Sequence, residues 1–89
     1  MVEYVKEVLS DENPNALFMD GFEDAIIGIG RQHSKPSLVV YDRQKCIQIL
    51  AKDMSWEEAV EFFSFNCEGA WMGENTPLIL DRGEAYNED

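Results

Sequence analysis

Residues 24–50 read DAIIGIGRQHSKPSLVVYDRQKCIQIL, and the period of the apolar residues changes within this stretch. Residues 24–30 alternate between two faces and predict a strand in which Gly28 and Gly30 share one face. Residues 37–42 are a second β-rich run, and the RQHSKP between them predicts a hairpin with a loop of about five residues. Asp42 is a favourable N-cap, and residues 43–53 then follow a helical spacing.

The rest of the chain places helices on either side of this hairpin. Residues 2–9 have helical spacing, and residues 10–14 form a breaker cluster that ends the helix. Residues 16–22 fit a helical turn and a strand equally well. Ser55 and Glu58 form a capping box for a helix with a continuous apolar stripe from Trp56 to Cys67. Residues 78–81 predict a closing strand. The order α-β-β-α-α-β predicts an α+β fold, with helices on one face of a small, mostly antiparallel three-stranded sheet.

The length of 89 residues predicts one domain, residues 1–80, followed by a loose acidic tail at 81–89. The apolar fraction of 45% is that of a folded protein. No apolar run approaches the ~20 residues that span a bilayer, and MVEYVKEV lacks the basic and apolar regions of a secretory signal. We therefore expect a soluble protein of the cytoplasm.

The net charge of −11 disfavours direct binding to nucleic acid and to anionic membranes, because phosphate groups would be repelled. It permits a basic protein partner. More than half of this charge lies at the two ends, residues 1–12 and 81–89, where charge commonly serves solubility alone.

Two cysteines, Cys46 and Cys67, are too few for a disulfide framework or a four-cysteine zinc site. We expect two buried, reduced thiols that act as small apolar side chains. His33 has no zinc-site spacing to either cysteine, and we interpret it as an exposed loop residue. No cofactor is predicted.

A cluster of carboxylates precedes the first predicted strand and consists of Asp20, Glu23 and Asp24. With Asp42 and His33 these residues could assist a metal-dependent enzyme, but their spacing does not match an EF-hand. The alternative is a polar turn set by Asp20 and Gly21. The glycines of GIGRQ lie inside a strand pattern and lack the lysine of a phosphate loop.

The helix after Ser55 has more aromatic residues than one face can bury, and it also carries a series of acids. Either the sheet and the first helix wrap around these rings, or some of them form an exposed patch. The acids are either a solvated face or an electrostatic surface for a basic protein. The candidate protein-binding residues are Glu57, Glu58, Glu61, Phe62, Phe65, Glu68 and Trp71.

Three segments together resemble a family of small uncharacterised proteins of tailed bacteriophages and prophages. They are FMDGFEDAIIGIGRQ (18–32), PSLVVYDRQKCIQIL (36–50) and MSWEEAVEFFSFNCEGAWMGENTPLIL (54–80). The resemblance covers roughly residues 18–80 and implies no activity and no catalytic residue. It implies a phage-encoded protein in the host bacterial cytoplasm.

These observations favour a small acidic phage accessory protein that is not an enzyme and binds a host or phage protein, as an inhibitor, host-takeover or anti-defence factor. One alternative is a metal-assisted enzyme that uses Asp20, Glu23 and Asp24. The other is a structural or assembly protein that associates with itself. The sequence leaves open whether the protein is a monomer or a homodimer.

Overall fold

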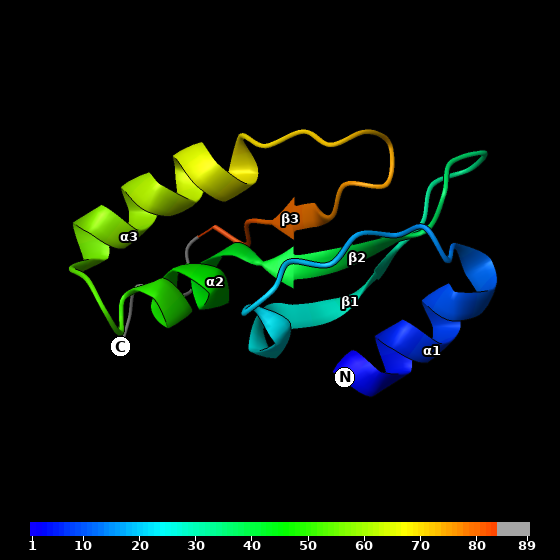
Figure 1. Cartoon of the computed structure of the whole chain (residues 1–89), viewed down its shortest axis with the longest axis horizontal. Coiled ribbons are helices and arrows are strands. Elements are labelled where there is room, and N and C mark those ends of the chain that lie inside the picture. Colours follow the sequence, from blue (N-terminus) through cyan, green and yellow to red (C-terminus); the bar gives the residue numbers. More distant parts are fainter. Residues whose placement is uncertain (84–89) are drawn as a thin grey trace.

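The computed structural model describes residues 1–83 and shows an α+β domain (Figure 1). Residues 84–89 of the predicted acidic tail lie outside the described residues. The elements, in chain order, are α1 (Val2–Glu12), the 3₁₀-helix η1 (Glu23–Ala25), β1 (Ile26–Gly30), β2 (Leu38–Asp42), α2 (Arg43–Leu50), α3 (Trp56–Phe63), the π-helical turn η2 (Ser64–Glu68) and β3 (Leu78–Leu80).

The three strands form one sheet in the order β1-β2-β3, with β2 in the middle (Figure 1). β1 and β2 pair antiparallel as the hairpin, but β3 pairs parallel to β2. The predicted α+β class and order of elements are confirmed, and the sheet is mixed, with one antiparallel and one parallel strand pair. A parallel neighbour requires a long crossover connection. The two helices between β2 and β3 provide that crossover, so the same run of elements gives a mixed sheet.

β1 begins two residues later than the alternating pattern suggests. Asp24 and Ala25 belong to η1, and the strand register shifts between Ile26 and Gly28. The inserted residue at this bulge lets Ile26 face the core beside Tyr41, although the strict alternation of the sequence puts Ile26 and Gly28 on one face.

The core lies on one face of the sheet. Tyr41 and Val39 are fully buried on β2, and the helices place their apolar stripes against them. The buried cluster consists of Val5, Leu9, Ala25, Ile26, Val39, Tyr41, Cys46, Ile47, Ala59 and Phe63. The predicted layer of helices on one sheet face is therefore present.

The predicted starts of α2 and α3 are confirmed by the hydrogen bonds of their capping side chains. The Asp42 carboxylate accepts from the backbone N–H groups of Gln44 (3.0 Å) and Lys45 (3.3 Å). Ser55 Oγ accepts from the N–H of Glu58 and the Glu58 carboxylate accepts from the N–H of Ser55, both at 3.1 Å. These local side-chain bonds satisfy N–H groups that the helix itself leaves without partners.

Residues 13–22 form mostly an extended arm that ends in a turn and crosses β1 and β2 (Figure 1). The arm includes residues 16–22, whose sequence fits a helical turn and a strand equally well. The Asn13 side-chain amide donates to the carbonyl of Ser37 (2.8 Å) and to Oδ1 of Asn75 (2.9 Å). The Met19 N–H donates to the hydroxyl of Tyr41 (2.7 Å). These long-range bonds replace the ladder that a regular strand would provide, and the arm covers the core face.

The opposite face of the sheet has no such cover among residues 1–83. A Cβ atom at Gly28 would meet nothing within 4 Å. Gly28 pairs with Val40, and Val40 pairs with Leu78, so these three residues share the open face. The face of β1 that carries the glycines is therefore open at Gly28.

Candidate functional site

The structure divides the seven predicted protein-binding residues between two surfaces. Glu57 is exposed on α3. Glu58, Glu61, Phe62 and Phe65 line a hollow on the outer side of α3. Glu68 and Trp71 line a separate groove beside β3. The sequence placed all seven together because they are close along one helix, and it did not show where the chain turns away.

The first surface, here called the α3 hollow, has a volume of about 450 Å³ and is lined by Met54, Glu58, Glu61, Phe62, Phe65 and Asn66. Phe62 is 44% exposed and Phe65 is 76% exposed, whereas Phe63 between them is fully buried. Helical geometry explains the difference, because consecutive side chains point about 100° apart. Of the two alternatives for the aromatic residues, the structure selects the exposed patch.

The α3 hollow extends beyond α3 onto a widened helical turn. In η2 the N–H of Gly69 bonds to the carbonyl of Ser64 at 3.1 Å, a five-residue step that is rare in proteins and frequent near functional sites. A Cβ atom at position 69 would lie 3.1 Å from that carbonyl oxygen, so glycine lets the turn close. The Asn66 amide donates to the carbonyl of Phe62 (3.0 Å) and holds this turn against α3.

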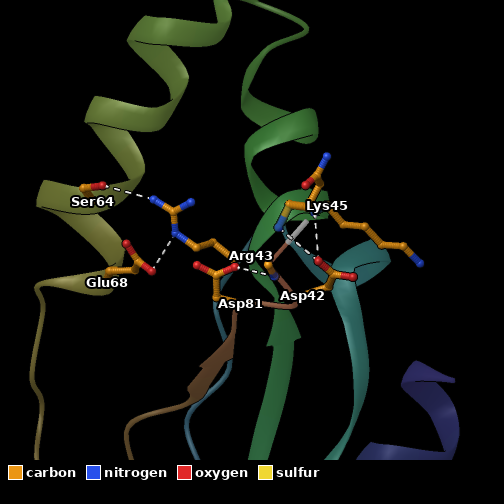
Figure 2. A network of polar contacts seen from close by, with 8 residues as sticks. Asp42, Arg43, Lys45, Ser64, Glu68 and Asp81 are labelled. Atoms are coloured by element: carbon orange, nitrogen blue, oxygen red, sulfur yellow. Dashed lines mark hydrogen bonds and ion pairs between the residues drawn. The ribbon is translucent and has the colours of Figure 1, made fainter. Parts of the chain in front are cut away.

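Figure 2 shows a polar network that joins α2 to η2. Arg43 Nε donates to the Glu68 carboxylate at 2.8 Å, and Arg43 Nη2 reaches Ser64 Oγ at 3.4 Å. Residues 56–71 contain no lysine or arginine, but the fold pairs Glu68 with Arg43 from α2. Glu68 is therefore less available to a partner than Glu57 and Glu61.

A second ion pair holds the chain after β3. Arg82 contacts the carboxylate of Asp42, which is 1% exposed and also caps α2. Arg82 belongs to the predicted loose tail, and within the described part of that tail it is tied to the end of β2. Asp42 thus serves the structure at the junction of β2, α2 and the chain after β3.

The second surface, here called the β3 groove, has a volume of about 460 Å³. Its lining comes from the hairpin loop, β3 and the chain that leads into β3, and consists of Gln32, Lys35, Pro36, Leu38, Cys67, Glu68, Ala70, Trp71, Glu74, Thr76, Pro77, Leu78 and Ile79. Trp71 is 75% exposed at this groove. The sequence treated residues 78–81 only as a closing strand and missed the groove, although an all-apolar run outside the helical stripe is a signal of a surface to be covered.

The alternative metal site is not assembled in the described part of the chain. Within residues 1–83 no three histidine, cysteine or acidic side chains come close enough to hold a metal ion. Asp20 lies in a turn, Glu23 and Asp24 lie in η1, and Asp42 is committed to the α2 cap. His33 is exposed in the hairpin loop, as the sequence indicated.

Both cysteines are free thiols. Cys46 is fully buried, and Cys67 is only half-buried. Burial, with a smaller contribution from Cys67, raises the pKa of the Cys46 thiol to about 12, and burial also raises the pKa of Cys67. Neither thiol is therefore activated as a nucleophile in this fold.

No known protein family, no curated protein and no solved structure matches this chain. The resemblance to small phage proteins therefore rests on the sequence motifs alone. Within residues 1–83 no helix is long and apolar enough to cross a membrane.

Proposed function

We propose that this chain is a small acidic binding protein, and that the α3 hollow is its contact surface for a basic protein. The observation that carries the proposal is the pair of exposed rings, Phe62 and Phe65, in a hollow that is also lined by Glu58 and Glu61. Exposed aromatic side chains are typical anchors of protein interfaces, and surrounding charges orient the partner.

The charge of the α3 hollow supports a basic partner. Glu57 and Glu61 lie one helical turn apart on the exposed side of α3, and no ion pair in residues 1–83 neutralises either of them. Like charges at this spacing destabilise an isolated helix by a few tenths of a kcal/mol. A basic partner would relieve that repulsion and gain the attraction of the whole chain, whose net charge is −11.

The motif resemblance supports the biological setting that we propose. A phage-encoded protein of this kind would act in the host bacterial cytoplasm, on a host or phage protein, as an inhibitor, host-takeover or anti-defence factor. The proposed role requires no cofactor and no catalytic residue.

The test is affinity capture from bacterial lysate by the tagged full-length protein, followed by titration of the captured, purified partner. We expect the double variant Phe62→Ala/Phe65→Ala to weaken binding at least ~10-fold, since truncated interface anchors commonly cost that much. Tyr4→Ala is the matched control, because Tyr4 is an aromatic residue that is 60% exposed on α1.

A second titration separates charge from apolar contact. Binding should weaken between about 0.1 M and about 1 M salt, where the Debye length falls from about 10 Å to about 3 Å. Glu61→Gln should reduce that salt dependence, and Glu7→Gln on α1 should not. A partner that binds the double phenylalanine variant as tightly as the native protein would refute the assignment of the α3 hollow.

A further inference from the structure

The outer edge of β3 is an unpaired strand edge. β3 pairs with β2 on one side, and in residues 1–83 no backbone hydrogen bond outside the sheet involves Leu78, Ile79 or Leu80. Backbone groups of a strand point alternately to its two sides, so the outer side of β3 presents N–H and C=O groups that have no backbone partner within residues 1–83. Such an edge is a template for a further strand.

The side chains of β3 do not protect this edge. Natural edge strands commonly carry lysine or proline, which discourage pairing. β3 is instead Leu-Ile-Leu, with Leu78 46% exposed and Leu80 43% exposed on the same open face. Gly30 leaves room for Leu78 to lie against the sheet, because a Cβ atom there would come within 2.7 Å of Leu78 Cδ1.

The β3 groove borders the first two residues of β3, Leu78 and Ile79. The chain of residues 69–77 arches outside β3 before it turns back into the strand (Figure 1). Trp71 from this arch and Leu78 from β3 both line the groove. The volume of about 460 Å³ lies within the ~300–1,000 Å³ that is usual for ligand clefts. The groove thus combines an unpaired backbone, an apolar floor and an exposed indole ring.

We propose that the β3 groove binds an extended segment of a partner protein, in which apolar and basic side chains alternate, as a fourth strand beside β3. Main-chain bonds to β3 would provide affinity, and the groove would select alternate side chains. The charges favour basic residues, because the chain has a net charge of −11 and the groove is lined by Glu68 and Glu74 against the single cation Lys35.

The occupant that we infer is a partner segment and not a second copy of this chain. A second copy would bring another net charge of −11 to the same edge, and like charges disfavour such a complex. The inference is independent of the α3 hollow, because the two surfaces share no lining residue.

The probe is a blocked, fluorescein-labelled peptide of alternating valine and lysine, about six residues and ~20 Å long when extended. Fluorescence anisotropy with the full-length protein should show binding, and a peptide methylated at every backbone nitrogen should bind at least tenfold more weakly. Trp71→Ala and Leu78→Lys should each weaken binding several-fold. Phe65→Ala is the matched control, since Phe65 is 76% exposed on the other surface.

A second readout places the peptide. The chain has two tryptophans, so Trp56→Phe leaves Trp71 as the sole indole, and its emission should shift to shorter wavelength when the peptide covers it. Equal binding of the methylated peptide, no binding of the parent peptide at millimolar concentration, or loss of binding only in Phe65→Ala would each overturn the proposal. Sedimentation that shows a native dimer, converted to a monomer by Leu78→Lys, would assign the edge to a second copy instead.

Discussion

The native protein should lose stability at alkaline pH, and the Cys46→Ala variant should lose much less. Cys46 lies fully buried in the core cluster, where α2 packs against α3. Burial raises the pKa of its thiol from the ordinary 9.0 to about 12, and the neighbouring Cys67, Asp42 and Glu68 act in the same direction.

The sign and size of the effect follow from proton binding. Below pH 9 the thiol is protonated in the folded and the unfolded chain and adds no pH dependence. Between pH 9 and 12 the unfolded chain loses the proton while the folded chain keeps it, so the free energy of unfolding falls as pH rises. The free energy of unfolding falls by ~1.4 kcal/mol per pH unit in this range, and by ~4 kcal/mol in total between the two pKa values.

Cys46→Ala keeps the fold but lacks this titration. At neutral pH the variant should be less stable by ~1 kcal/mol, because a buried group of about methyl size is removed. The native protein loses that advantage as the pH rises, and the two free energies of unfolding should become equal at about pH 10.

Urea unfolding under reducing conditions, in steps from about pH 7 to about pH 10.5, measures both free energies. Tyr41, whose pKa is also raised by burial, is present in both proteins and cancels in the comparison. Cys67→Ala is the control, and because Cys67 is only half-buried it should remove less of the slope. A difference between native protein and Cys46→Ala that stays constant across this range would refute the reasoning.

Two further predictions concern Asp42 and the glycines. Asp42→Ala should destabilise the protein by ~2 kcal/mol, because it removes the cap of α2. Asp42→Asn should cost under ~1 kcal/mol, because asparagine still caps α2 and loses only the charge toward Arg82, which is 54% exposed. Equal losses of the free energy of unfolding in urea would contradict the capping role. Gly28→Ala should stabilise by ~0.5 kcal/mol, since its Cβ enters open space, whereas Gly73→Ala should destabilise by ~1 kcal/mol at a φ of +97°. A loss at Gly28 as large as that at Gly73 would show that the sheet face is covered.

Several local features of this protein could be read from the sequence because they depend on neighbours within one or two helical turns. The cap at Asp42 and the capping box of Ser55 and Glu58 use side chains three residues or fewer from the groups they bond. The apolar stripe of α3 and the hairpin of β1 and β2 follow from the 3.6- and 2-residue periods. The α+β class followed from the order of these elements.

The features that the sequence did not determine depend on residues far apart in the chain. The parallel pairing of β3 with β2 depends on how the crossover of residues 43–77 folds back, and an apolar strand of three residues has no signal for direction. The pairing of Arg43 with Glu68 and of Arg82 with Asp42 joins positions 25 and 40 residues apart. The division of the predicted site into the α3 hollow and the β3 groove has the same cause, since side-chain exposure is set by which element packs on which face.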